Sequence, residues 1–182
     1  VEGALVAKKL GFKSIVLARE TDIDTIKEIK EKTGLDVEVF VHGSLCVSYS
    51  GQCLFSSLVG GRSGNRGACA GSCRLPYELV GKDNAVLNKD KKYPLSMKDL
   101  CAVSSIGKLI DIGVNSFKIE GRMKSKEYVY LVTKLYRKAI DSYIENHKVV
   151  IDYNILDKLK KVFNRKYTLG FLNNVSNSDV IN

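Results

Sequence analysis

Five cysteines are the residues of this chain best suited to chemistry, and four of them crowd into a short segment. They are Cys46, Cys53, Cys69, Cys73 and Cys101, in the spacing C-x6-C-x15-C-x3-C-x27-C. Glycine, serine and arginine fill the gaps between the first four. This composition predicts thiols carried on bendable loops, where they could gather around a common centre.

The spacing of the cysteines favours some kinds of metal site over others. Zinc sites usually carry two closely spaced ligand pairs, and here only Cys69 and Cys73 are that close. Iron–sulfur clusters accept wider spacing and are held by four thiolates. A cysteine can also be a small buried apolar side chain or a redox thiol. The spacing favours an iron–sulfur cluster or another metal and leaves buried or redox thiols open.

A second candidate site lies between the second and third cysteines, in Gly60-Gly61-Arg62-Ser63-Gly64-Asn65-Arg66-Gly67. Glycines and arginines in such a run can form a backbone nest for a phosphate or carboxylate. A flexible loop with solvated arginines is the alternative. The Gly-Lys-Ser/Thr ending of a Walker A loop is absent.

The third candidate follows an expected strand, in Lys118-Ile119-Glu120-Gly121-Arg122. Ligands of α/β folds bind outside the carboxyl ends of strands, and His42 ends another strand in the same way. Lys118, Glu120 and His42 are therefore catalytic candidates, with an ion pair at the strand–helix junction as the alternative. Cys46 and His42 could form a nucleophile–base pair, but four residues across a strand end is poor geometry.

Composition limits the function classes. The chain has 182 residues, 45% of them hydrophobic, and a formal charge of +9. The charge favours polyanions such as nucleic acid, or reflects solvated lysine-rich helices. No apolar run approaches the ~18 residues of a membrane span, and no export signal is visible. We expect reduced thiols in a cytoplasmic protein, and a chain without an initiator Met that is a piece of a longer one.

Helices and strands must position these residues. Helices are expected over residues 2–10, from a Thr21 N-cap to Gly34, over 98–112, from a Ser125 cap to 147, and over 154–163. Strands are expected over residues 14–18, 37–41, 77–80, 85–87 and 116–119. The alternation predicts an α/β fold with parallel strands, either a small open sheet or the back half of a barrel. Residues 173–182 are expected to be a frayed polar tail.

The run HGSLCVSYSGQCLFSS, with GGRSGNRGACAGSCRLPY after it, resembles the signature of peptidase family U32, the collagenase-like peptidases. The segments PLSMKDLC, FKIEGRMKSKEYV and VFNRKYTLGFL fit in the same order, although Lys166 stands where the family usually has glycine. The resemblance implies a TIM-barrel-like fold of which residues 1–172 are the C-terminal half, with the cysteine segment as a loop insertion. The unpaired strand edges of such a half barrel could also pair with a second copy to form a dimer, as an artefact of the missing half, or with a partner subunit.

The resemblance also implies chemistry. Some branches of the family hydroxylate a tRNA uridine, a ribosomal RNA cytidine or a quinone precursor, and hold a [4Fe–4S] cluster. The matching ligands here are Cys46, Cys53, Cys69 and Cys101, with Cys73 as the alternate. Prephenate is the implied hydroxyl source of the tRNA branch, and its carboxylates would suit arginines. The anion-binding candidates are Arg62, Arg66, Arg74 and Arg122.

Three functions follow for the full-length protein. The leading expectation is a [4Fe–4S]-dependent factor that hydroxylates a base of tRNA or 23S rRNA. The second is a collagenase-like peptidase, as the family name states, although the chain lacks H-E-x-x-H and G-x-S-x-G motifs. The third is an RNA-binding part of a larger modification enzyme.

Overall fold

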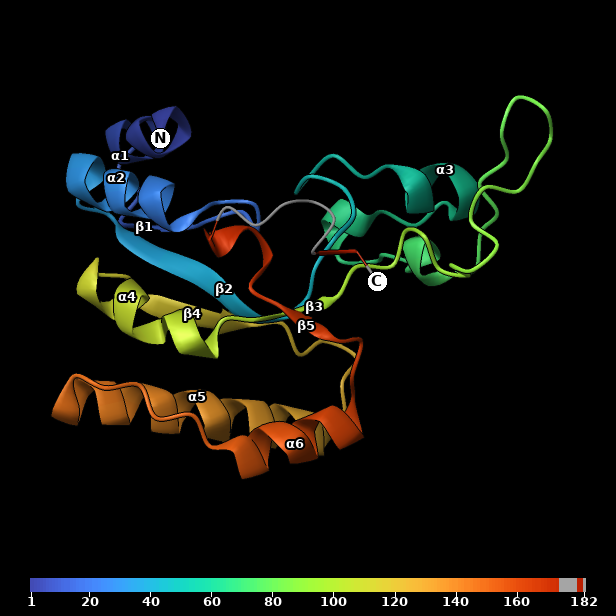
Figure 1. The fold of residues 1–182 in the computed structure, drawn as a ribbon. Helices are drawn as coiled ribbons and strands as arrows, with labels where there is room; N and C mark the ends of the chain where they lie inside the picture. The colour runs from blue at the N-terminus through green and yellow to red at the C-terminus, as the bar shows by residue number, and fades with distance from the viewer. Residues whose placement is uncertain (174–179, 182) are drawn as a thin grey trace.

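A five-stranded mixed sheet forms the centre of the computed structural model, which describes residues 1–173 and 180–181 (Figure 1). The strands are β1 (Ser14–Val16), β2 (Asp36–Ser44), β3 (Asp99–Cys101), β4 (Ser116–Ile119) and β5 (Tyr167–Thr168). The long strand β2 pairs in parallel with β1 and β4, and antiparallel with β3. β5 runs parallel to β3. The expected α/β class is confirmed, and β2 is the strand to which three others attach.

The three longest helices each begin at a residue whose side chain caps them. They are α1 (Glu2–Lys9), α2 (Ile23–Thr33), α3 (Phe55–Gly60), α4 (Ile106–Asp111), α5 (Lys126–Asn146) and α6 (Tyr153–Val162). Ser125 caps α5 as expected, since its side chain accepts a hydrogen bond from Tyr128 N. The expected Thr21 cap is wrong: Asp22 caps α2, because its carboxylate reaches Thr25 N. Gly34 ends α2 in the left-handed conformation.

The sheet and its helices share one apolar core. Figure 1 shows α1 and α2 above β1, and α5 and α6 below the sheet. Val37, Val39 and Val41 of β2 are buried, as are Val132 and Leu135 of α5. Burying such a side chain contributes about 1.5–3 kcal/mol each. The side of α5 that packs on the core carries its buried residues Tyr128, Val132, Leu135, Tyr136 and Ala139.

The carboxyl end of β2 is irregular, and this irregularity decides where His42 points. The register of β2 against β4 shifts between Phe40 and His42. Such a bulge turns the following side chain to the other face of the strand. His42 thereby meets Tyr128 and Tyr136 of α5. The next residue, Gly43, has a φ of +111°, and a Cβ there would lie 2.5 Å from Glu120 O.

The expected helix over residues 98–112 is wrong in its first part. Residues 99–101 form β3, residues 103–105 a 3₁₀ turn, and only Ile106–Asp111 is α-helical. The apolar residues Leu100, Val103 and Ile106 fit helical spacing, so the sequence alone favours a helix. Pairing of β3 with β2 overrides this preference, and it also makes one strand antiparallel where parallel strands were expected.

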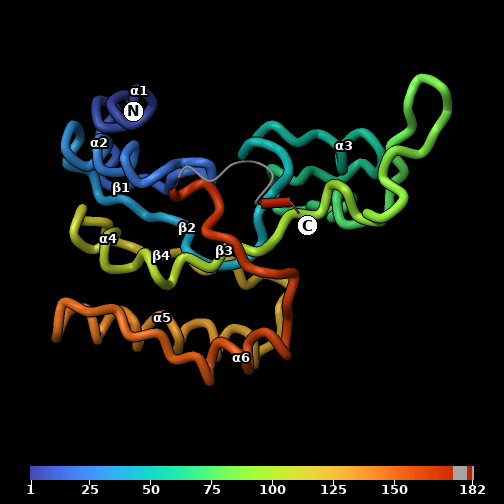
Figure 2. Tube along the Cα trace, viewed as in Figure 1, coloured from blue at the N-terminus to red at the C-terminus, as the bar shows by residue number. Residues whose placement is uncertain are grey.

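Residues 45–98 leave the sheet and form a lobe that carries α3 and projects away from the helices (Figures 1 and 2). The strands expected over residues 77–80 and 85–87 reduce to a single bridge between Val80 and Val86. The Asn88 side chain replaces further pairing, because it bonds to Tyr77 O, Leu79 N and Lys91 O. Within the described ranges, none of the helices combines the length and apolar character needed to cross a membrane.

Residues 180–181 pack against the core. Residues 174–179 and 182 of the expected frayed tail lie outside the described residues. Val180 is buried, Lys98 N donates to Val180 O, and Ile181 bridges to Met97. At residues 180–181 the expectation of fraying is therefore wrong, because two apolar residues pair beside the start of β3.

Candidate functional site

Four of the five cysteines lie in the lobe that follows β2. Cys46 comes directly after the strand, Cys53 precedes α3, Cys69 precedes a 3₁₀ turn and Cys73 lies within it. All five thiols are free; Cys69 is exposed and the others are half-buried. Gly71 N points at Cys69 Sγ over 3.3 Å, and Ser56 Oγ lies 4.0 Å from the same sulfur.

The four lobe thiols are electrostatic neighbours. Burial raises the pKa of Cys73, the Arg74 charge lowers it, and Cys46, Cys69 and Cys53 each raise it further. Among the described residues, however, no three His, Cys, Asp or Glu side chains are already placed to hold a metal ion. The thiols are thus gathered in one region but not arranged as ligands.

Cys101 has different surroundings. It lies on β3 opposite His42, and its thiol is a neighbour of the Tyr136 hydroxyl of α5. Burial is the main cause that raises the pKa of this thiol. Of the predicted set, the structure brings together Cys46, Cys53 and Cys69, and it places Cys73 rather than Cys101 beside them.

The predicted arginines fall into two groups. Arg74 is held inside the lobe: its guanidinium donates to Ser96 Oγ, Met97 O and Leu45 O. It ties both ends of the lobe together and has few donors left for a ligand. Arg122 donates to Gly67 O at 3.1 Å, which links the end of β4 to the lobe. Within the described residues, the exposed Arg62 and Arg66 make no side-chain hydrogen bond or ion pair, so they stay open to an anion.

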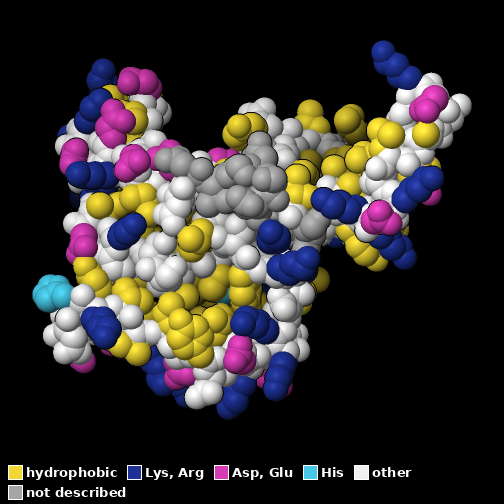
Figure 3. Space-filling model, in the orientation of Figure 1, with side chains coloured by type: hydrophobic (Ala, Val, Ile, Leu, Met, Phe, Trp, Pro, Cys, Tyr) yellow, Lys and Arg dark blue, Asp and Glu magenta, His cyan; other side chains and the backbone are white. Residues whose placement is uncertain are grey.

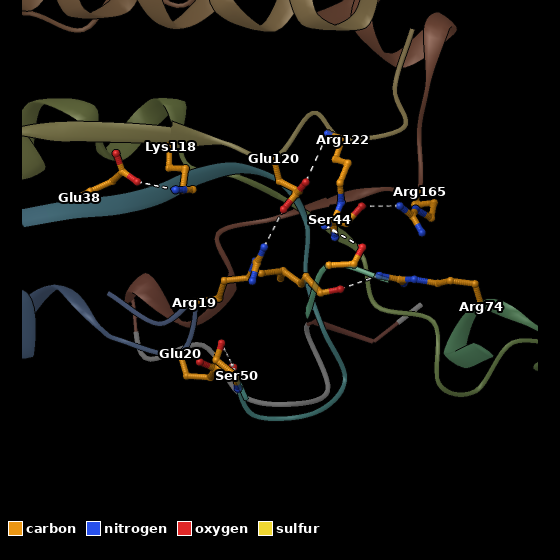
Figure 4. Close-up of polar contacts among 12 residues, drawn as sticks. Arg19, Glu20, Glu38, Ser44, Ser50, Arg74, Lys118, Glu120, Arg122 and Arg165 are labelled. Atoms are coloured by element: carbon orange, nitrogen blue, oxygen red, sulfur yellow. Dashed lines mark hydrogen bonds and ion pairs between the residues drawn. The ribbon is translucent and has the colours of Figure 1, made fainter. Parts of the chain in front are cut away.

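Lys118 and Glu120 do not pair with each other. Lys118 Nζ lies 2.6 Å from Glu38 Oε1, whereas Glu120 Oε2 lies 2.9 Å from Arg19 Nη2 (Figure 4). Hydrogen bonds from Lys118 and Ser116 lower the pKa of Glu38. The structure therefore shows ion pairs at the end of β4, the alternative to a catalytic role. Lys118 pairs with Glu38, and Glu120 pairs with Arg19.

His42 is buried and faces α5. Its Nδ1 lies 3.3 Å from the Tyr136 hydroxyl, which itself donates to Val41 O at 2.6 Å. Burial, and then the Lys124 charge, lower the pKa of His42 to about 4. A neutral imidazole packed among tyrosines is not placed as the base of Cys46.

Sequence reasoning missed a polar cluster around His42. Asp99 is 1% exposed, and Arg165 Nη2 lies 3.3 Å from Asp99 Oδ1 and 2.6 Å from Ser44 Oγ. Tyr128 and Tyr167 complete the cluster, their rings 6.0 and 5.6 Å from that of His42. The one available signal was a charged residue, Asp99, between the apolar residues Leu95, Met97, Leu100 and Ala102.

Several atoms of this cluster have no partner. Within the described part of the chain, the buried atoms without a hydrogen bond are His42 Nε2, Asp99 Oδ1 and Oδ2, Tyr128 OH, Arg165 Nε and Tyr167 OH. The contact of Arg165 with Asp99 is an ion pair without hydrogen-bond geometry. Buried polar groups are normally satisfied, so six such atoms at one end of a sheet mark an unusual place.

Comparisons with known proteins identify one family and several relatives. "Peptidase family U32" matches residues 1–182. "tRNA hydroxylation protein P1" of Bacillus subtilis (strain 168) is 43% identical over 170 residues, 90% of this chain and 40% of that protein. "23S rRNA 5-hydroxycytidine C2501 synthase" of Escherichia coli (strain K12) is 42% identical over 180 residues, 95% of this chain and 27% of that protein.

A third relative has a different name. "Collagenase" of Porphyromonas gingivalis (strain ATCC BAA-308 / W83) is 37% identical over 172 residues, 86% of this chain and 41% of that protein. The chain thus spans less than half the length of each of these relatives. No solved structure matches it. With a family match over its whole length, the chain belongs to peptidase family U32.

Proposed function

We propose that the full-length protein is an iron–sulfur-dependent factor that hydroxylates a base of tRNA or 23S rRNA. The observation that carries the proposal is the combination of relatives at 43% and 42% identity, named for tRNA hydroxylation and 23S rRNA hydroxycytidine synthesis, with four gathered thiols. The net charge of +9 fits a polyanionic substrate.

The donor chemistry of the lobe fits a [4Fe–4S] cluster. Such clusters are held by four thiolates, and Cys46, Cys53, Cys69 and Cys73 provide that number in one lobe. A bound cluster would supply one-electron transfer. Because the thiols are not yet arranged as ligands, we propose that cluster binding orders the lobe.

The chain's own side chains support substrate binding around this lobe. Arg62 and Arg66 are exposed on it and have free guanidinium donors for RNA phosphates or for the carboxylates of prephenate. Arg122 and Arg74 hold the lobe against the sheet end. Removing an exposed arginine should therefore weaken binding, whereas removing Arg74 should disturb the lobe itself.

Anaerobic preparation of the full-length protein tests the cluster. We expect iron and sulfide in about equal amounts, and their loss in Cys53→Ser. For the fourth ligand, proximity favours Cys73, so Cys73→Ser should lose the cluster and Cys101→Ser should keep it. The reverse result would assign Cys101 and require β3 to rearrange when the cluster binds. Wild-type protein free of iron and sulfide under anaerobic conditions would end the proposal.

Nucleoside analysis tests the activity. Deletion of the gene should remove one hydroxylated nucleoside from tRNA or 23S rRNA, and the wild-type gene should restore it. The Cys53→Ser gene should not, whereas Lys134→Arg, on the exposed side of α5, should restore it fully. Unchanged RNA after deletion would contradict hydroxylation.

Proteolysis is the second candidate, because one relative is named "Collagenase". In the described residues the buried His42 hydrogen bonds to a tyrosine, not to a serine or cysteine, which weighs against a nucleophile–base pair here. Gelatin cleavage by highly purified full-length protein, abolished by one substitution in this chain, would favour proteolysis.

We further propose that this sheet is part of a TIM-barrel-like sheet completed by the rest of the protein. The parallel pairing of β1, β2 and β4 and the short relative coverage support this. In that arrangement Arg19, Glu38, Phe40 and Lys118, which contact one another on one face of the sheet, would face the barrel interior.

A further inference from the structure

Lys124 lies beside the polar cluster, in surroundings that disfavour a charged amine. It directly precedes Ser125, the N-cap of the 21-residue helix α5, where the helix dipole is positive. Arg165 and Arg74 are close enough to add further repulsion. Cations are normally placed at the other end of a helix, so this position needs an explanation.

The backbone holds the lysine there. Met123 has a left-handed φ of +63° and is 97% exposed, whereas Lys124 is half-buried. A left-handed non-glycine residue costs about 1–3 kcal/mol and persists where the surroundings impose it. A strained turn thus sends the methionine outward and the lysine inward, toward the cluster.

Aromatic rings surround the amine. Lys124 Nζ lies 2.9 Å from the centre of the Phe163 ring and 5.3 Å from that of Tyr128. The Phe163 ring attracts a cation, and so do Asp99 and Glu120, but burial outweighs them. The groups that act on this amine are Asp99, Glu120, Arg74, Arg165, Tyr128 and Phe163. Burial is the largest cause that lowers the pKa of Lys124, to about 8; the Arg165 and Arg74 charges also lower it, and the Asp99 and Glu120 charges raise it.

The unpartnered atoms behind Lys124 define what could occupy the site. Arg165 Nε and the hydroxyls of Tyr128 and Tyr167 are free donors, and Asp99 provides free acceptor oxygens. Arg74 and Arg165 carry more charge than Asp99 can balance, since Glu120 is already paired with Arg19. These donors and acceptors suit a small carboxylate that also carries a polar oxygen. Within the described structure, the Lys124 amine beside them has no ion pair.

We propose that the Lys124 amine forms an imine with a small keto acid whose carboxylate is held by Arg165. A half-buried lysine beside other cations is an amine suited to attack a carbonyl. The nitrogen lone pair bonds to the carbonyl carbon, and the carbonyl oxygen leaves as water with the two amine protons. No electron is gained or lost in this step. Tyr128 and Tyr167 can donate to the carbonyl oxygen, and Asp99 can accept from the hydroxyl that forms.

Reductive trapping tests this inference in the full-length protein, with pyruvate as the probe and cyanoborohydride as the reductant. Peptide mapping by mass spectrometry should find one reduced adduct on Lys124, formed at least about tenfold faster than on the neighbouring Lys126. Trapping should weaken as the pH falls below 8, because protonation removes the lone pair. Absence of the adduct, or equal labelling of Lys124 and Lys126, would overturn the proposal in wild-type protein.

Variants test the named groups. Lys124→Arg should abolish the specific adduct, and Lys126→Arg should leave it unchanged. Arg165→Met should slow trapping of pyruvate about tenfold while leaving that of acetone, which lacks a carboxylate, unchanged. Equal slowing of both would remove the keto-acid assignment. Because these readouts require neither a cluster nor RNA, their failure is separate from a failure of the proposed hydroxylation.

Discussion

At the scale of single residues, the end of β2 depends on side chains that sequence patterns do not rank. Gly43 has no room for a side chain, because a Cβ there would collide with Glu120 O. The side chain of its neighbour His42 is buried among tyrosines. Both lie where β2 meets the lobe. Substitutions here should therefore report on the geometry that positions Ser44 and Cys46.

Gly43→Ala should destabilise the full-length protein by about 2 kcal/mol or more, because the new Cβ would collide with Glu120 O in a backbone conformation unfavourable to alanine. Urea unfolding measures the change. Gly3→Ala is the matched control, since a Cβ there meets nothing within 4 Å. Equal effects of the two substitutions would contradict the close approach.

His42 should make stability sensitive to acid. Its pKa is about 4 when folded and near 6.5 when unfolded, so between these values the unfolded chain binds more protons. Stability is therefore full above pH 6.5 and falls toward pH 4, by up to about 3 kcal/mol from this residue. Urea unfolding of wild type and His42→Asn at pH 7 and pH 4.5 should show a smaller loss in the variant. A loss of the same size in both would remove His42 as the cause.

At the scale of elements, the ends of helices depend on local side-chain chemistry, whereas strand pairing depends on contacts with distant residues. Ser125, Asp152 and Gly34 lie at helix ends and have the side chains or conformation that ends require. Strand β3 has no comparable local signal, and its three residues adopt their conformation through β2 and β5. Helix ends were therefore largely predictable, and β3 was not.

Ser125→Ala should cost about 1 kcal/mol, because Tyr128 N would lose its acceptor at the start of α5. Ser125→Asp should restore most of the stability, since aspartate caps helices equally well. Thermal unfolding of the two variants of the full-length protein provides the comparison. Equal destabilisation by alanine and aspartate would show that the hydroxyl has another role.

At the scale of the whole molecule, the sheet and its helices form one part and the lobe of residues 45–98 another. The lobe exposes apolar side chains, among them Tyr49, Leu54, Leu58 and Val59 (Figure 3). It is held to the sheet by Arg74, Arg122 and the Glu20–Ser50 hydrogen bonds. Few buried contacts and many exposed apolar residues indicate low local stability.

Hydrogen exchange should separate these two parts. In cluster-free full-length protein, amides of residues 45–98 should exchange faster than those of β2 and α5, because the lobe has little core. Anaerobic reconstitution with iron and sulfide should slow exchange in the lobe and leave α5 unchanged. Slowing of both regions to the same extent would mean that the cluster stabilises the whole fold rather than the lobe.

The sequence by itself determined the α/β class, the boundaries of α2, α5 and α6 within a few residues, and the family, because these depend on local periodicity, helix caps and a long cysteine motif. Only the tertiary structure decided which side chains meet. It placed Cys73 beside the other lobe thiols, paired Lys118 and Glu120 with other residues, and assembled Asp99, Lys124, Tyr128, Arg165 and Tyr167 around His42. The physical reason is that these contacts join residues distant in the chain, through a bulge in β2 and an antiparallel strand that no local pattern encodes.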